Sequence, residues 1–184
     1  SPGSVAEFLD RRGEELRGLL SRLAGKQEWG VKVFREPQRL LEAVEASSEP
    51  LRRLAEEAAR SSPGRAYLLR KQRQRLLASE ADRLTRQWLD AILQALQQAS
   101  DGLWVDQLLD VPGGQPALVL KAAFLVPTAR VDAFRSVADS LERQYAPLGL
   151  QLELDGPWAP YSFVGGMRGR EALSGRTHGT SGTG

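Results

Sequence analysis

The segment of residues 117–126 (ALVLKAAFLV) is the most apolar stretch of this chain of 184 residues. Because it is apolar on both faces and too short for a typical helix, it predicts a strand in the middle of a sheet. Residues 28–34 alternate, with Trp29, Val31 and Val33 on one face, and residues 150–154 alternate strictly. Residues 103–109 also have strand character. The chain is therefore expected to fold around a sheet of four strands.

Helical patterns occupy the segments between these strands. Residues 5–23 place apolar side chains at helical spacing up to Gly25, and residues 128–145 form a second amphipathic segment. Two shorter helices are expected between Pro37 and the turn before residue 65. Residues 65–98 contain neither glycine nor proline, which predicts one long helical arm or two helices with a bend. Such an arm is expected to pack on neighbouring helices or on a partner.

The order strand, helices, strand, strand, helix, strand predicts the fold class. It is an α+β fold, with the ferredoxin-like split βαβ arrangement of an antiparallel sheet and helices on one face. The first crossover is expected to hold a multi-helix insertion over about residues 38–100. Residues 26–164 would form this domain.

The two ends of the chain lie outside the expected domain. The sequence opens without methionine and runs directly into the helix within residues 1–25, so we expect this helix to lead from a missing N-terminal domain. Residues 165–184 hold mostly Gly, Ser, Thr and Arg, which is typical of a disordered tail.

The composition narrows the functional class. No apolar run reaches the roughly 18 residues that a membrane span needs, and the N-terminus does not resemble a signal peptide, which favours a cytoplasmic protein without membrane contact. With no cysteine, disulfides and thiolate metal sites are excluded. The formal net charge of +2 is nearly balanced.

Catalysis has little support in the sequence. The one histidine, His178, falls in the expected tail, where no fixed geometry would hold it. There is no Gly-rich phosphate loop, no metal-ligand spacing and no Ser-His-Asp set. We therefore expect a protein that is not an enzyme and that carries no cofactor or metal.

Residues 155–163 (DGPWAPYSF) display three aromatic side chains from a backbone that two prolines and a glycine restrict. We call this segment the aromatic corner; its aromatic residues are Trp158, Tyr161 and Phe163. In one interpretation, Trp158 and Tyr161 close the end of the sheet and pack on the helix at 128–145. In the other, part of the corner forms a partner-binding edge, since aromatics dominate binding hot spots. The two interpretations can coexist.

Residues 65–75 form a basic cluster that contains no acidic residue; its cations are Arg65, Arg70, Lys71, Arg73 and Arg75. The cluster is interpreted first as a solvated helix face. It could also dock on an acidic protein surface or contact nucleic-acid phosphates. Nearby acidic residues and the absence of an RNP-type aromatic pattern argue against nucleic acid.

Three charged residues, Glu28, Lys32 and Lys121, fall on predicted strands. Their pairing cannot be derived from the sequence. Because a buried charge pair is costly, we expect them at an exposed edge.

Four stretches together resemble the gas vesicle accessory proteins of the F/L family. They are residues 28–33 (EWGVKV), 64–71 (GRAYLLRK), 122–126 (AAFLV) and 156–163 (GPWAPYSF). Their order resembles the second half of the family's chain, over about residues 5–165. The family's usual run is Thr-Gly-Pro-Trp-Pro-Pro-Tyr-Ser-Phe, from which this chain departs at Asp155 and Ala159.

The resemblance implies a non-enzymatic gas vesicle assembly factor or minor structural component. Its expected partners are the small, hydrophobic major shell protein and other gas vesicle accessory proteins, at gas vesicles in the cytoplasm. The candidate partner-binding residues are Trp158, Tyr161, Phe163, Arg65, Tyr67, Arg70 and Lys71. The alternative is a ferredoxin-like nucleic-acid-binding or regulatory module that uses residues 65–75.

Overall fold

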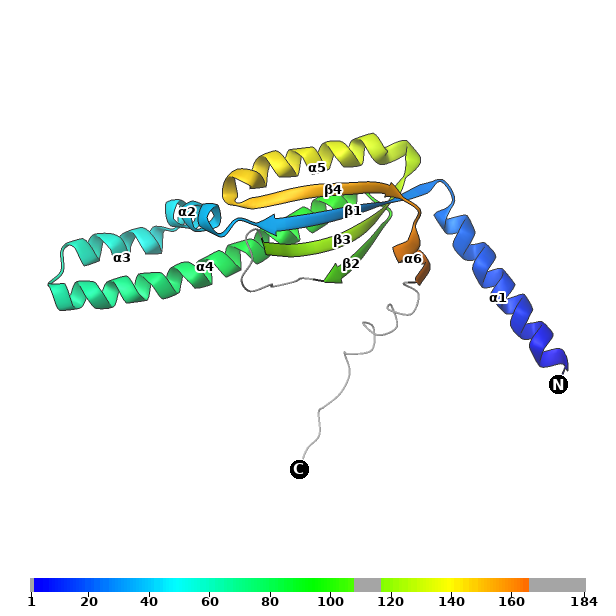
Figure 1. Ribbon diagram of the computed structural model, residues 1–184, viewed down its shortest axis with the longest axis horizontal. Helices are drawn as coiled ribbons and strands as arrows, with labels where there is room; N and C mark the ends of the chain where they lie inside the picture. The colour runs from blue at the N-terminus through cyan, green and yellow to red at the C-terminus, as the bar shows by residue number, and fades with distance from the viewer. Residues whose placement is uncertain (1, 108–116, 166–184) are drawn as a thin grey trace, which may run out of the picture.

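A four-stranded antiparallel sheet forms the centre of the molecule in a computed structural model that describes residues 2–107 and 117–165 (Figure 1). The strands are β1 (Lys26–Arg35), β2 (Gly102–Gln107), β3 (Ala117–Pro127) and β4 (Leu150–Trp158), in the order β2-β3-β1-β4. This is the predicted split βαβ arrangement, and β3 is central as its apolar sequence indicated. The expected tail, His178 and the end of the predicted strand at 108–109 lie outside the described residues.

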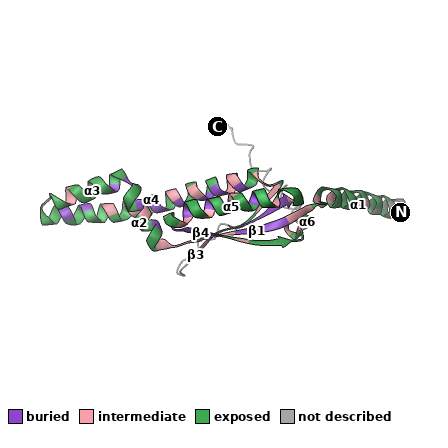
Figure 2. Cartoon of the chain, turned by 90° about the horizontal axis from the view of Figure 1, so that it is seen from above, coloured by how far each residue is buried: buried purple, intermediate pink, exposed green. Residues whose placement is uncertain are grey.

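Helices cover one face of the sheet. They are α5 (Val131–Tyr145) and the C-terminal half of α4 (Pro63–Gln98). The face of β1 that carries Trp29, Val31 and Val33 joins this core, in which the rings of Phe124 and Phe134 lie 5.5 Å apart. Each fully buried side chain of this size contributes about 1.5–3 kcal/mol. Most of the stability of the fold is therefore expected from this layer, seen as buried residues in Figure 2.

The helical insertion comprises α2 (Pro37–Ser47), α3 (Glu49–Ala59) and α4, which is one continuous helix. Alongside α3, the first half of α4 extends away from the sheet, and we call this pair the helical arm. A second core of Leu40, Val44, Leu51 and Ala81 holds the insertion together. Trp88 contacts both cores and lies 6.3 Å from the ring of Tyr145. The arm is thus attached to the sheet by packing as well as by the chain.

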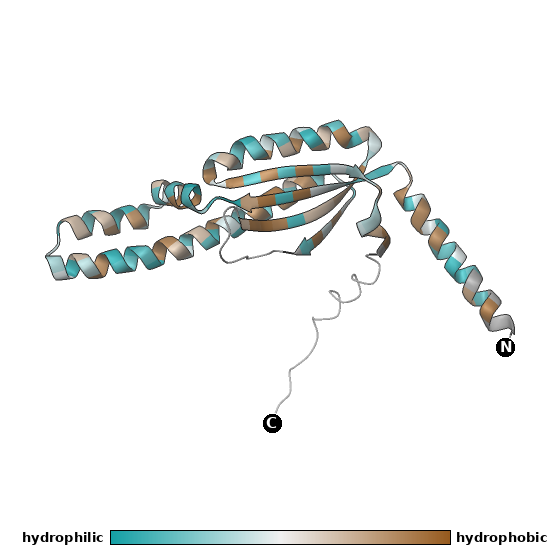
Figure 3. Cartoon of the chain, in the orientation of Figure 1, coloured by the Kyte–Doolittle hydropathy of each residue, from teal (hydrophilic) through white to brown (hydrophobic). Residues whose placement is uncertain are grey.

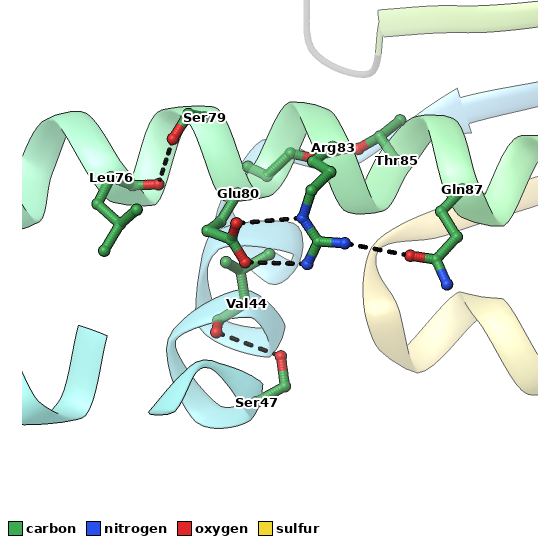
Figure 4. Close-up of polar contacts among 9 residues, drawn as sticks. Val44, Ser47, Leu76, Ser79, Glu80, Arg83, Thr85 and Gln87 are labelled. Carbon is green, nitrogen blue, oxygen red and sulfur yellow. Dashed lines mark hydrogen bonds and ion pairs between the residues drawn. The ribbon is translucent and has the colours of Figure 1, made fainter. Parts of the chain in front are cut away.

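Several polar side chains of α4 form hydrogen bonds within the helix where it passes α2 (Figure 4). Arg83 donates hydrogen bonds of 3.1 and 3.0 Å to Glu80 and one of 3.3 Å to Gln87. The buried hydroxyl of Thr85 donates to the carbonyl of Ala81 at 2.7 Å. These bonds let a long helix run from the second core to the sheet without an unpaired polar group at Thr85.

The helix α1 (Pro2–Leu23) projects from the body of the molecule. Four of its apolar residues are more than half exposed: Val5, Phe8, Leu16 and Leu20. They alternate with charged residues along the helix in Figure 3. The helix agrees with the sequence pattern, and the N-terminal domain stays a prediction.

Polar contacts fix the junction of α1 with the sheet. The backbone N–H and the hydroxyl of Thr128 both donate to the carbonyl of Gly25 at 2.9 Å. Asp101 contacts Lys26 at 2.9 Å and also Arg130. The hydrogen bond from Lys26, followed by the charges of Lys26 and Arg130, lowers the pKa of Asp101 despite a smaller opposing effect of burial. This carboxylate therefore stabilises the junction in its ionised form.

We predict a pH dependence from Asp101. The pKa of Asp101 is lower in the folded protein than in the unfolded chain, where it is about 3.9. The contribution of Asp101 to folding stability is therefore fully present above about pH 3.9 and is lost as the pH falls through the pKa of the folded protein. Asp101→Asn should therefore destabilise the protein at pH 7 and have a smaller effect near pH 3. Thermal unfolding at both pH values measures this difference. An equal difference at both would contradict the assignment.

Gly149 should be intolerant of any side chain. It has φ +87°, and a Cβ there would lie 2.5 Å from the backbone nitrogen of Leu40 in α2. Gly149→Ala is expected to cost about 1–3 kcal/mol in backbone strain, and more from the clash. Urea unfolding measures the loss, with Gly64→Ala as control because a Cβ at Gly64 meets nothing within 4 Å. Equal midpoints for the two variants would disprove the predicted contact.

Candidate partner-binding surface

The aromatic corner begins while the chain is still paired in the sheet. β4 continues to Trp158, which lies opposite Glu28 of β1, whereas the sequence predicted a strand that ends at residue 154. The Gly156–Pro157 peptide bond is cis, and Gly156 has φ +138°. A Cβ at Gly156 would lie 3.0 Å from the carbonyl oxygen of Glu28, so glycine is required at this close approach.

Glu28 fixes the corner to the sheet. Its carboxylate accepts a hydrogen bond of 2.8 Å from the backbone N–H of Ser162 and one of 2.7 Å from the Ser162 hydroxyl. The residue is only 9% exposed, so the expectation of an exposed edge was wrong for Glu28. A buried carboxylate needs such donors, and Ser162 supplies them from α6 (Tyr161–Gly165). α6 is thereby held across the end of the sheet.

The three aromatic residues of the corner have different environments. Phe163 is half-buried, and its ring packs against Gly102 of β2. A Cβ added at Gly102 would lie only 3.0 Å from Cε1 of Phe163. Trp158 and Tyr161 are 54% and 76% exposed. The interpretation that these two pack on the helix at 128–145 was therefore wrong, and Phe163 instead fills the space over β2. Trp158 and Tyr161 remain available for a partner.

The sheet face opposite the helices carries a shallow depression of about 270 Å³, which we call the sheet groove. Gly30 of β1 and Ala123 of β3 pair directly in its floor. Trp104 of β2 and Trp158 of β4 lie at its margins. Because these are the two edge strands, their backbones are three strand spacings apart, or about 14 Å. The aromatic corner thus forms one margin of a wider surface.

Charged side chains cross the sheet beside this floor. Lys32 lies directly opposite Lys121 in the β1–β3 pair, and Lys121 forms an ion pair of 2.8 Å with Asp106. Both lysines are on central strands, so the expectation of a sheet edge was also wrong for them. Lys121 is nevertheless exposed, and Lys32 is partly so.

The basic cluster lies on the helical arm, far from the aromatic corner (Figure 1). Arg65 pairs with Glu57 of α3, and Arg73 pairs with Glu45 of α2 at 2.9 Å. Within the described residues, Arg70, Lys71 and Arg75 form no ion pair, and the Lys71 ammonium lies 5.8 Å from the centre of the Tyr67 ring. The fold therefore neutralises part of the cluster, which weakens the phosphate-binding alternative.

The start of α4 also exposes two neighbouring apolar side chains, of which the sequence analysis named Tyr67 as a candidate but not Leu68. Tyr67 is 57% exposed and its neighbour Leu68 is 66% exposed. Together with Arg70 and Lys71 they form what we call the arm tip. The candidate residues therefore divide between two surfaces, the arm tip and the aromatic corner.

No site for a metal ion is found among residues 2–107 and 117–165, because no three Asp, Glu or His side chains there are grouped suitably. Over the same residues, no helix is long and apolar enough to cross a membrane. Neither surface has the enclosed, convergent polar groups of a reaction site, and both have the exposed aromatic residues of a binding surface.

Known proteins resemble the chain over nearly all of its described length. It is 36% identical to gas vesicle protein L of a Streptomyces species over 88% of this chain and 57% of that protein. It is 32% identical to gas vesicle protein F of the same strain, over 88% of this chain and 64% of that protein. The chain thus spans about three fifths of these relatives.

Two crystal structures share the fold. GvpF from Anabaena superposes with a TM-score of 0.61 at 21% identity, over 86% of this chain and 62% of that one. GvpF from Microcystis aeruginosa gives 0.55 at 19% identity, over 89% and 64%. The family model described as "Gas vesicle synthesis protein GvpL/GvpF" matches residues 1–165. The chain belongs to this GvpL/GvpF family of gas vesicle proteins.

Proposed function

We propose that this protein acts in gas vesicle assembly by binding the major shell protein, together with other accessory proteins, and that it is not an enzyme. Family membership supports the gas vesicle role. The observation that carries the binding role is the exposure of Trp158 and Tyr161 on a backbone that Glu28 anchors. An assembly factor of this kind would act at the gas vesicle.

A rigid aromatic surface suits the physical task of such a factor. A small, hydrophobic shell subunit must be kept from aggregating through its apolar faces and strand edges before it is incorporated. Trp158 and Tyr161 can cover apolar surface while losing little conformational freedom, because the Glu28–Ser162 bonds already fix the segment. The corner also adjoins β4, an edge strand of the sheet.

Two exposed carboxylates are unsuited to act as general acids. The hydrogen bond from Arg53 lowers the pKa of Glu49, and the hydrogen bond from Arg83 lowers the pKa of Glu80. A general acid needs the opposite shift, toward neutral pH. These carboxylates belong to ion pairs along exposed helix faces, where they support solubility and helix stability.

The arm tip is a second candidate surface for a partner. Its combination of Tyr67 and Leu68 with Arg70 and Lys71, which form no ion pair with any described residue, suits an acidic surface with an apolar patch. Its distance from the sheet would allow a second partner to bind at the same time. We propose that other accessory proteins dock there.

Removal of the two exposed rings should abolish most shell-protein capture. Trp158→Ala with Tyr161→Ala is expected to weaken binding at least about 30-fold, as loss of a hot spot of 2 kcal/mol or more does, while the fold remains intact. Co-purification of co-expressed shell protein measures capture, and circular dichroism checks the fold. Phe8→Ala removes an exposed ring from α1 as a control. A folded double variant with normal capture would refute the proposed role of the corner.

The anchoring of the corner can be tested separately. Ser162→Ala leaves one oxygen of the buried Glu28 carboxylate without its donor, which should cost about 1–3 kcal/mol. Capture should weaken less than in the double variant because both rings remain. Urea unfolding gives the stability, with Ser140→Ala on the exposed side of α5 as control. Equal stability of the two variants would show that the Glu28–Ser162 bond does not anchor the corner.

A further inference from the structure

Packing contacts within the chain do not require glycine at position 30. It lies within the central strand β1 and is not among the glycines with positive φ. A Cβ at this position would lie 3.5 Å from the carbonyl oxygen of Asp155 and 3.6 Å from its Cβ, which are ordinary contacts. Glycine inside a strand costs about 0.5–1 kcal/mol relative to alanine. A glycine inside a strand often marks a bulge, as in the β1–β4 register shift between Glu28 and Gly30, or the close approach of a ligand or another backbone.

The other glycines of this end of the sheet are different. At Gly102 a Cβ would lie 3.0 Å from the Phe163 ring, and at Gly156 it would lie 3.0 Å from the Glu28 carbonyl. At these two positions, contacts within the chain leave no room for a side chain. The missing side chain of Gly30 instead opens the floor of the sheet groove, beside Ala123.

The walls of the groove suit a protein side chain. Its volume of about 270 Å³ is close to the lower end of the roughly 300–1,000 Å³ usual for small-molecule pockets, so its lining and not its size indicates the ligand. Trp104 and Trp158 line it from the two edge strands, and the small residues Gly30 and Ala123 lie between them. This arrangement favours an apolar side chain of a peptide segment that lies across the sheet.

One positive charge of the groove has no ionic partner within the described residues. Like charges directly opposite each other destabilise a sheet, and Lys32 faces Lys121. Asp106 compensates Lys121, but the Lys32 ammonium makes no hydrogen bond or ion pair with any described residue, including Asp155 of the groove lining. Glu153, its neighbour on β4, is exposed and forms no ion pair with it. A carboxylate from outside would satisfy Lys32.

We propose that the sheet groove binds a segment of the shell protein in which an apolar side chain stands next to Asp or Glu. The apolar side chain lies on Gly30 and Ala123 between the two tryptophans, and the carboxylate pairs with Lys32. This inference rests on the proposed function, because it takes the shell protein as the partner. It adds the site and the chemistry of the segment that is recognised.

Filling the floor of the groove provides the first test. Gly30→Val should fold with equal or higher thermal stability, because a Cβ fits and valine favours strands, yet it should capture shell protein at least 10-fold more weakly. Ala133→Val, on the exposed side of α5, is the control. Wild-type capture with equal capture by Gly30→Val would overturn the inference and leave the proposed function standing. No capture by the wild type would overturn both.

Charge reversal provides the second test, with overlapping synthetic peptides of the shell protein as probes and tryptophan fluorescence as the readout. Lys32→Glu should weaken binding of the best peptide at least 10-fold, and a peptide with its Asp or Glu changed to Lys should restore it. Arg86→Glu, on an exposed position of α4, should bind the original peptide normally. Failure of the reversed peptide to restore binding, or a best peptide without a carboxylate, would overturn the inference.

Discussion

The central strand β3 is largely apolar on both faces, and the helices of this chain cover only one face of the sheet. On the covered face, β1 and β3 meet α4 and α5 in a core that holds Ile92, Phe124 and Phe134. On the other face, Leu125 and Ala123 are still buried, 7% and 8% exposed. The second face of the sheet therefore has to be shielded from water by something other than α4 and α5. This need explains the shape of the candidate surface.

The chain meets this requirement partly with the aromatic corner. Glu28 is the residue that makes it possible, because its carboxylate holds α6 over the end of the uncovered face. Phe163 then shields Gly102 and its surroundings on β2, while Trp158 and Tyr161 extend into solvent. The remaining uncovered area is the sheet groove.

Sequence patterns were sufficient for the sheet, its strand order and the helical character of residues 65–98, but they left open whether this segment forms one helix or two. These features follow from local periodicity, and the split βαβ order follows from chain connectivity. The environment of Glu28 could not be derived in this way, because its partner Ser162 is 134 positions away. The same holds for Arg73, which pairs with Glu45 across 28 positions. Its charge is therefore compensated within the fold, although the sequence around it contains no acidic residue. The rigidity of residues 155–163 was visible in their prolines, but the direction of Trp158 depends on its register opposite Glu28.

Hydrogen exchange measured by mass spectrometry, with and without the shell protein, tests the central claim most directly, since it reports where the partner lies. If the uncovered sheet face binds the shell protein, exchange should slow in β2, β4 and α6 at residues 102–107, 150–158 and 161–165. Residues 63–75, which include the arm tip, should exchange at the same rate as in the free protein. Protection confined to residues 63–75, with no change at the sheet, would contradict the account.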